Sequence, residues 1–485
     1  MVVQTNQQQI RKIQTQLRVK IRRVVTARLL ILNFFESMLE FKKIELNDAL
    51  KIQKLTYNNE ILACEKNAVN LIVWQRAYNN MYAEKDGMLF LKSGKEKSQS
   101  FGLPICNDLK KGLECIFEYT APQKPRFWVQ NDSKIEEFKA LLGDEYDISP
   151  VRDAFDYIYN REDLANLVGK KYHSKRNHIS AFSKQFNWCF KPITNKNIND
   201  VLACAEKWYR ENDDRMDEYM AIESEGIKTI LENMELLNVK GGAIYVENEV
   251  VAFTLGSPIN DYVFDIHIEK ALKDYAAAYT VINNEFAKTL EGYKYINRED
   301  DMGLSGLRKA KLSYKPEILL EKYRCRPLRD ACIRLYDNAF HDGPFTNKLF
   351  DLCFNDIKTL RINGETVAMC FLLPCEIEGK KAKYVYGFTV KEKHRGKGYG
   401  KALMEKIKDE TNDILILRPA ESRLIDYYKQ FGFCEVAASN QEGDISVVPT
   451  DSFLNLCEKD KKGEYTAMTY GFKTDKTLYF PYSLA

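Results

Sequence analysis

The chain has 485 residues and a formal net charge of +3, with 72 Lys and Arg against 69 Asp and Glu. This near-neutral balance produces no global basic field, so it excludes overall charge as an argument for nucleic-acid binding. The 12 cysteines, none in a CxxC pair, and the 5 histidines exclude a zinc-finger framework and a disulfide scaffold, so we expect reduced thiols, no metal site and a cytoplasmic protein of about three domains.

We expect no transmembrane segment, because no apolar run approaches the roughly 20 residues that span a bilayer. Residues 1–37 are rich in Gln, Lys and Arg, with Glu36 as their only acid. We interpret them as an extension outside a fold that begins at Met38. The alternative is a basic amphipathic helix that binds a membrane or targets an organelle.

Residues 38–186 show a mixed α/β pattern, with apolar residues at helix spacing in some segments and at strand spacing in others. The periodicity predicts helices at 46–55 and 134–142 and strands at 87–91 and 154–159. Each segment has a length typical of a globular domain.

A basic helix is predicted at 162–179, where Lys175 and Arg176 lie among further Lys and His residues. Such a face can bind the phosphates of RNA, of a lipid headgroup or of a nucleotide. A solvated helix surface is the simpler interpretation of the same run.

Residues 187–325 form a second α/β pattern. It predicts helices at 201–210, 220–237 and 276–290 and strands at 241–246, 249–255 and 262–268. The acids at 299–301 can bind a cation, but we interpret them as a solvated turn.

Three segments of this front half resemble a known family. They are YHSKRNH at 172–178, NREDDMG at 297–303 and LRKAKLSYKP at 307–316. They look like the signatures of uncharacterised bacterial proteins related to the C-terminal catalytic domain of phosphatidylglycerol lysyltransferases. The resemblance implies two fused acetyltransferase-like lobes over 38–325, similar to the peptidoglycan-bridge aminoacyltransferases, in which an aminoacyl-tRNA supplies the acyl group.

The last third, 326–485, has a distinct order of predicted elements. These are helices at 328–339 and 344–353, a hairpin of strands 357–362 and 366–373, a strand at 384–390, a helix from Tyr399, a strand at 413–417 and a helix at 421–430. The hairpin turn is Asn363-Gly364, a strong two-residue turn signal.

A glycine-rich basic loop connects the strand 384–390 to the next helix. It reads Arg395-Gly396-Lys397-Gly398-Tyr399-Gly400-Lys401. Glycines allow positive φ and close approach of a ligand, and the helix N-terminus and the basic side chains add positive potential, so the loop predicts a site for a pyrophosphate. Its spacing fits neither a P-loop nor a Rossmann turn.

The pattern R-x-x-G-x-G, in this order of elements, resembles the acyl-CoA-binding loop of the GNAT superfamily of N-acetyltransferases. The resemblance implies acetyl-CoA as co-substrate, with its acetyl group passing to an amine of a small molecule or peptide. The backbone of the strand end would pair with the pantetheine arm and the loop would hold the pyrophosphate. The cofactor-binding residues are then Phe388, Thr389, Val390, Arg395, Gly396, Lys397, Gly398, Tyr399, Gly400 and Lys401.

The helix 421–430 closes with a Tyr-x-x-x-Gly-Phe ending, and the resemblance places the family's catalytic tyrosine at Tyr428. A phenol, with a pKa of about 10, suits protonation of a leaving thiolate. Tyr427 is the alternative, and the two side chains point about 100° apart on a helix. No general base stands out, although Glu392, Glu421 and Asp426 are close in sequence.

We therefore expect an α/β protein of three GNAT-like mixed-sheet units: lobes at 38–186 and 187–325 and an acetyltransferase domain at 326–485. In the front module, a channel for tRNA or another phosphate-rich anion is one interpretation of its basic residues, and a structural ion-pair network is the other. Those residues are Lys175, Arg176, Arg298, Arg308, Lys309 and Lys311. Aminoacyl transfer from a charged tRNA and a non-catalytic binding role remain alternatives for this module.

Overall fold

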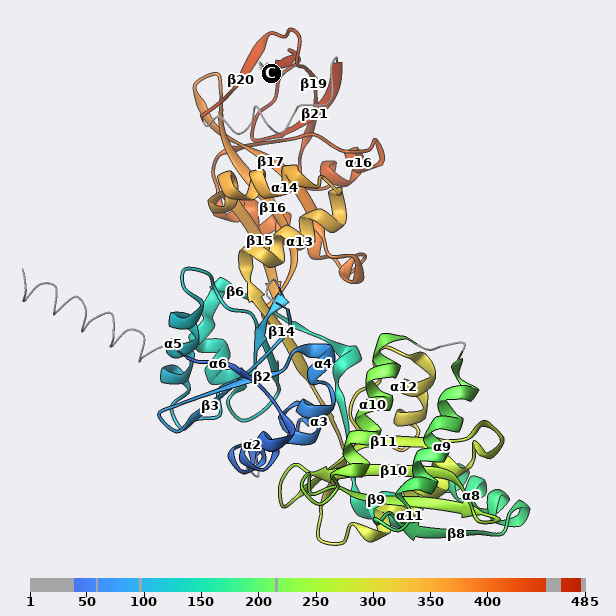
Figure 1. The fold of residues 1–485 in the computed structure, drawn as a ribbon. Helices are drawn as coiled ribbons and strands as arrows, with labels where there is room; N and C mark the ends of the chain where they lie inside the picture. Colours follow the sequence, from blue (N-terminus) through green and yellow to red (C-terminus); the bar gives the residue numbers. More distant parts are fainter. Residues whose placement is uncertain (1–38, 58–59, 96–97, 214–216, 451–463, 481–485) are drawn as a thin grey trace, which may run out of the picture. The chain divides into compact units, whose positions relative to one another are not determined.

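A computed structural model describes residues 39–57, 60–95, 98–213, 217–450 and 464–480 (Figure 1). The extension expected at 1–37 lies outside these residues. The chain divides into two compact units, which we call the front unit (Met1–Leu141 and Val151–Lys322) and the rear unit (Leu142–Pro150 and Tyr323–Ala485). Residues 142–150 thus group with the rear unit, although the sequence suggested that they belong to the first lobe.

The first sheet of the front unit is built from short strands near the N-terminus. Strands β1 to β5 lie side by side in chain order: β1 (Lys42–Lys43), β2 (Met81–Lys85), β3 (Met88–Ser93), β4 (Ser100–Phe101) and β5 (Phe127–Gln130). The associated helices are α2 (Ala49–Thr56), α3 (Ala68–Val73), α4 (Gln75–Tyr78), α5 (Leu109–Thr120) and α6 (Ile135–Leu142). Ile52 and Leu71 from α2 and α3 pack against Tyr82, Leu89 and Leu91 of the sheet.

The second sheet of the front unit has seven strands in the order β13-β7-β12-β11-β10-β9-β8. Their bounds are β7 (Asp156–Asn160), β8 (Trp188–Pro192), β9 (Lys240–Val246), β10 (Glu249–Pro258), β11 (Val263–Ala271), β12 (Tyr295–Asn297) and β13 (Ile318–Leu320). The strands expected at 241–246 and 249–255 are confirmed as β9 and β10, which form a hairpin whose turn residues Glu247 and Asn248 have φ of 49° and 73°. Strand β7 belongs to this sheet, whereas the sequence pattern places its residues in the first lobe.

Helices cover both faces of this second sheet (Figure 1). On one face of the sheet, Phe253 and Leu255 of β10 pack against α9 (Ile198–Glu211) and α10 (Glu218–Glu232). Val251 and Ala252 pack against α11 (Ala278–Thr289) and α8 (His173–Gln185). A strand buried on both faces requires apolar residues in both phases of its pleat.

The single basic helix expected at 162–179 is wrong. The segment forms α7 (Arg161–Asn166) and α8, separated by a left-handed residue, Leu167, and by Gly169, which has a φ of 86°. The left-handed conformation ends a helix, since the next peptide cannot continue the hydrogen-bond ladder.

The rear unit contains an eight-stranded sheet in the order β15-β16-β17-β18-β21-β19-β22-β20. Its strands are β15 (Ile357–Ile362), β16 (Glu365–Ile377), β17 (Lys380–Val390), β18 (Ile414–Leu417), β19 (Cys434–Ser439), β20 (Ile445–Pro449), β21 (Glu464–Tyr470) and β22 (Leu478–Tyr479). Strands β6 (Tyr146–Pro150) and β14 (Lys322–Pro327) pair antiparallel. The expected turn at Asn363-Gly364 is confirmed, with φ of 50° and 85°.

The two faces of β16 bury different helices. Met369 and Phe371 face α13 (Leu328–Phe340) and α14 (Pro344–Cys353). Ala368 and Cys370 face α15 (Tyr399–Glu410) and α16 (Arg423–Lys429). The described residues thus form three mixed α/β sheet assemblies, and the expected fold class is confirmed. None of their helices combines the length and apolar character needed to cross a bilayer.

Candidate functional site

The rear-unit site begins at an irregularity in β17. Opposite β16, Thr389 pairs with Met369 and Tyr386 pairs with Phe371, so Gly387 and Phe388 together face one residue of β16. This is a β-bulge, which bends a strand and turns its side chains toward new directions. Gly387 has a φ of 59°, and an added Cβ would lie 2.7 Å from the ring of Tyr336. Glycine is therefore required at the bulge.

The bulge coincides with the point at which β17 leaves its other neighbour. Strand β18 pairs in parallel with β17 only through Ala382, Lys383 and Tyr384. The end of β17, including Phe388, extends beyond this last pair. Strand β18 does not cover the backbone edge of this segment. A pantetheine arm needs such an uncovered edge in order to pair with the strand.

The glycine loop follows directly. Gly396 and Gly398 have φ of 74° and 82°, and a Cβ at either position would meet no atom within 4 Å. These glycines are needed for backbone conformation, and the space above them is open. Gly400 is needed for packing, because a Cβ there would lie 2.7 Å from the hydroxyl oxygen of Tyr427.

Helix α15 starts at Tyr399, and no side chain caps its first turn. The first amides of a helix have no carbonyl partner within the helix, so they remain donors for a ligand. Arg395, Lys397 and Lys401 are exposed around this turn, and Arg395 Nε donates to the carbonyl of Val390 at 3.2 Å. The loop therefore combines free donors with positive charge, as an anion site requires.

A buried carboxylate anchors the start of the loop. Glu365 accepts from Lys391 at 2.6 Å and contacts Lys393 at 2.8 Å and His394 Nε2 at 3.1 Å. Burial opposes ionisation of Glu365, but the hydrogen bonds from the two lysines outweigh it and hold the pKa at about 2. The ion pairs fix the turn at Glu392–His394, immediately before Arg395.

Tyr428 is buried in α16, with 7% of its surface exposed, and its ring meets that of Phe388 edge-on at 6.4 Å. Burial raises the pKa of Tyr428 above its ordinary value, so the phenol remains protonated at neutral pH. Tyr427 is half-buried, and its hydroxyl lies over Gly400. Tyr428 thus lies beside the β17 bulge and Tyr427 beside the glycine loop.

The carboxylates that the sequence suggested as bases, Glu392, Glu421 and Asp426, are all exposed. Nothing in their surroundings distinguishes one from the others. Cys370 and Cys375 are buried in the core, and burial raises the pKa of both thiols. A raised pKa does not favour a nucleophilic thiolate.

In the front unit, several of the proposed phosphate-binding residues are used internally: Arg298 and Arg308 form ion pairs, and Lys311 bonds to the backbone. Arg298, whose side chain is 10% exposed, donates to Glu269 at 2.6 Å. Arg308 donates to Asp301 at 2.8 Å, and Asp301 is completely buried. Lys311 is buried and donates to two backbone carbonyls. The solvated turn expected at 299–301 is therefore wrong, because Asp301 balances a buried network.

The remaining basic residues differ in exposure. Lys175 lies 3.6 Å from the centre of the Tyr314 ring, and burial, together with the nearby Arg298, lowers its pKa to about 8. Arg176 donates to two backbone carbonyls between α7 and α8. Lys309 is exposed on α12 (Ser305–Leu312). It borders an open surface hollow of about 530 Å³ lined by Gly303, Ser305, Arg308, Lys309, Leu312, Ser313 and Lys315.

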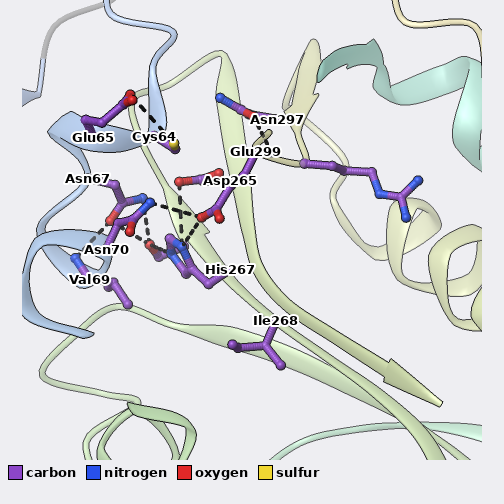
Figure 2. Close-up of polar contacts among 12 residues, drawn as sticks. Cys64, Glu65, Asn67, Val69, Asn70, Asp265, His267, Ile268, Asn297 and Glu299 are labelled. Atoms are coloured by element: carbon purple, nitrogen blue, oxygen red, sulfur yellow. Dashed lines mark hydrogen bonds and ion pairs between the residues drawn. The ribbon is translucent and has the colours of Figure 1, made fainter. Parts of the chain in front are cut away.

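The structure reveals a second polar centre, on β11. Leu255 of β10 pairs with Ile268 and Gly256 pairs with Ile266, so His267 is the extra residue of a bulge. Strand β12 pairs in parallel with β11 only through Val263, Phe264 and Asp265. Figure 2 shows Asp265 and His267 pointing toward Glu299, which follows β12.

These three side chains lie close together but make only long contacts with one another. His267 Nδ1 lies 3.4 Å from Glu299 Oε1 and 3.6 Å from Asp265 Oδ2. Burial raises the pKa of Asp265 well above its ordinary value and that of Glu299 to about 8, and it lowers the pKa of His267 to about 3. This centre was not predicted from the sequence. Its signal was two polar residues, Asp265 and His267, in the same phase of a strand expected to be buried.

A neighbouring group already contains its own cation. Lys322 Nζ contacts Asp156 at 2.6 Å and Glu65 at 2.5 Å, and it lies 3.5 Å from Cys64 Sγ. Both Lys322 and Asp156 are completely buried. Cys64 and Glu65 appear beside the β11 centre in Figure 2.

Comparison with known proteins finds a family match in each of the two units. Residues 61–326 match the family model described as phosphatidylglycerol lysyltransferase, C-terminal. The chain belongs to this family. Residues 356–435 match the acetyltransferase (GNAT) domain. The matches confirm the two resemblances seen in the sequence and show that the protein contains acyltransferase-type domains.

Individual relatives of this lysyltransferase-family protein carry little functional information. An uncharacterised protein of Mycoplasmoides gallisepticum is 26% identical over 186 residues, which is 37% of this chain and 58% of that relative. A crystal structure of a conserved protein of unknown function from Bacteroides thetaiotaomicron is 36% identical, with a TM-score of 0.56, and covers 59% of this chain and 99% of its own. The C-terminal domain of a putative lysylphosphatidylglycerol synthetase from Agrobacterium fabrum is 12% identical, with a TM-score of 0.46, and covers 61% and 95% of the two chains.

Proposed function

We propose that the rear unit transfers an acetyl group from acetyl-CoA to a primary amine. The observation that carries the proposal is the loop at 395–401, which presents uncapped helix amides and exposed basic side chains above two positive-φ glycines. A pyrophosphate is an anion of the size and charge that such a loop binds. The GNAT match over 356–435 supports an acyl-CoA as the ligand that carries this pyrophosphate.

The proposed reaction is direct attack. The amine nitrogen forms a bond to the thioester carbonyl carbon, the tetrahedral intermediate expels the CoA thiolate, and a proton from Tyr428 neutralises the sulfur. A backbone amide of the bulge near Phe388 would stabilise the oxyanion. The proton lost by the amine returns to Tyr428 through solvent, so the enzyme is regenerated. Holding donor and acceptor together supplies a large part of the rate enhancement.

Calorimetry with acetyl-CoA tests the proposal. We expect wild type to bind and Gly398→Glu to lose binding, because a carboxylate would occupy the open space above the loop and repel the pyrophosphate. Gly379→Glu is the matched control: Gly379 also has a positive φ of 72°, open space around its Cβ position and a place in a turn, between β16 and β17.

Both variants carry the same backbone strain and the same added charge. If wild type fails to bind acetyl-CoA, or if the two variants weaken binding equally, the loop is not the acyl-CoA site.

A second function concerns the front unit. Its match to the lysyltransferase family covers 61–326, and this supports aminoacyl transfer from a charged tRNA. The exposed hollow bordered by Lys309 and Lys315 is a candidate contact for the tRNA phosphates. With the full chain, we expect lysyl-tRNA binding that weakens steeply as salt rises. Binding without transfer would favour a non-catalytic binding role, and absence of binding would contradict aminoacyl transfer from lysyl-tRNA.

A further inference from the structure

The strongest unexplained feature of the front unit is Asp265. Its side chain is completely buried, and neither carboxyl oxygen has a hydrogen-bond partner. An isolated buried carboxylate is strongly unfavourable, so buried carboxylates in proteins are paired, protonated or bound to a metal. The oxygens of Asp265 face Nδ1 of His267, with Oδ2 3.6 Å away.

The nearby lysines do not compensate Asp265. Lys322 forms its contacts with Glu65 and Asp156. Lys311 donates to the backbone carbonyls of residues 298 and 300. Among the residues that the structure describes, the centre formed by Asp265, His267 and Glu299 therefore has two carboxyl groups and no ion-paired lysine or arginine of its own.

The separations fit ligands of a common ion better than they fit hydrogen bonds. Nδ1 of His267 lies 3.4 Å and 3.6 Å from the two carboxylate oxygens, which exceeds a good N–H···O distance. Two ligand atoms, each bound at about 2.1 Å to one tetrahedral metal, lie roughly 3.4 Å apart. The three ligand atoms all lie within 4.8 Å of one another.

The surrounding residues hold these groups in the required orientation. Ser257 Oγ lies 2.8 Å from His267 Nε2, and Asn67 Nδ2 donates to Ser257 at 3.0 Å. When Nε2 donates its proton to Ser257, the Nδ1 lone pair faces the carboxylate oxygens. A bound cation removes the repulsion between these lone pairs. Asn70 Nδ2 donates to Glu299 Oε1 at 3.0 Å. Such outer contacts are typical of metal-binding His and carboxylate groups.

We propose that Asp265, His267 and Glu299 bind one divalent transition-metal ion, Zn²⁺ or Mn²⁺. The imidazole ligand argues against Ca²⁺ and Mg²⁺, which prefer oxygen ligands alone. The Glu299 side chain is 22% exposed and leaves a route by which the ion can enter. The site is distinct from the proposed acyl-CoA loop. It differs from the sequence-based expectation of no metal site, which considered only the spacing of Cys and His along the chain.

Metal uptake by the full chain tests the site. After removal of metal with EDTA, incubation with Zn²⁺ and gel filtration, we expect about one tightly bound equivalent in wild type by elemental analysis. Asp265→Asn and His267→Gln should each weaken binding by more than about tenfold. Cys64→Ser, in the neighbouring group that Lys322 already neutralises, should retain the ion. Mn²⁺ should bind the same site, and excess Mg²⁺ should not displace Zn²⁺.

A measurement on wild type alone guards against variants that fail to fold. Crystals soaked in Zn²⁺ should show an anomalous peak about 2.1 Å from His267 Nδ1. The proposal is overturned if wild type binds neither Zn²⁺ nor Mn²⁺, if the peak lies elsewhere, or if folded Asp265→Asn and His267→Gln bind as wild type does. Loss of binding only in Cys64→Ser would assign the ion to the neighbouring group and overturn it equally.

Discussion

Strands β11 and β17 share a backbone design but carry different chemistry. Each pairs antiparallel with a long neighbour through a bulge, and each has a parallel partner that pairs for only three residues before the bulge. After β17, the chain enters a glycine loop and an uncapped helix. After β11, residues 272–277 contain no glycine. The bulge and the diverging strands therefore provide a place for a site, and the following loop decides which ligand can use it.

The two places also have opposite electrostatics. At β17, open amide donors and exposed basic side chains favour an anion. At β11, the buried groups are carboxylates, and the pKa of Asp265 and that of Glu299 are both raised by burial. A cation is the complementary ligand there. The segment after β11 therefore has no counterpart of the glycine-loop contacts proposed for the rear unit.

The largest expected effect tests whether the charges near β11 are structural. Lys322→Met removes the cation from Asp156 and Glu65 and leaves a completely buried carboxylate unpaired, so the free energy of unfolding should fall by about 3–5 kcal/mol. Chemical denaturation of the full chain measures this. Lys51→Met is the control, since Lys51 is exposed and pairs with Glu84 at the surface; it should change stability little. Equal effects would show that the buried charges do not support the front-unit fold.

The next effect tests the catalytic assignment at β17. Tyr428→Phe removes the proposed acid while keeping the ring that packs on Phe388, so kcat for acetyl transfer should fall by about 100-fold with little change in acetyl-CoA affinity. Tyr427→Phe serves as the control and should retain turnover. Reversed results would make Tyr427, whose hydroxyl lies over Gly400, the proton donor.

The smallest effect concerns the anchor of the glycine loop. Glu365→Gln removes the charge that holds Lys391, Lys393 and His394, so acetyl-CoA should bind about fivefold more weakly. Glu376→Gln, an exposed acid on the same strand, is the control.

The same anchor predicts a pH dependence. The folded pKa of Glu365, about 2, lies below its ordinary value of 4.5. The ion pairs therefore stabilise the rear unit fully above pH 4.5, and this contribution is lost as pH falls toward 2. Thermal unfolding across this range should show a smaller decline for Glu365→Gln than for wild type. Parallel curves would contradict the anchoring role.

Local sequence was sufficient for much of the rear unit. The hairpin at Asn363-Gly364, the end of β17 and the glycine loop all depend on residues adjacent in the chain, where turn chemistry and periodicity act directly. The front unit was harder, because β7 joins a sheet whose other strands follow it by many residues. Pairing over such distances leaves no local pattern.

By itself, the sequence determined the order of elements from α13 to α16 in the rear unit and the loop at 395–401, since short-range conformational preferences set both of them. It also carried the two family resemblances. Only the tertiary structure decided that Arg298 and Arg308 are paired internally, that Asp301 belongs to a buried network, and that Asp265, His267 and Glu299 meet. Burial and charge pairing depend on segments brought together by folding, so the protonation and the ligands of these groups follow from packing.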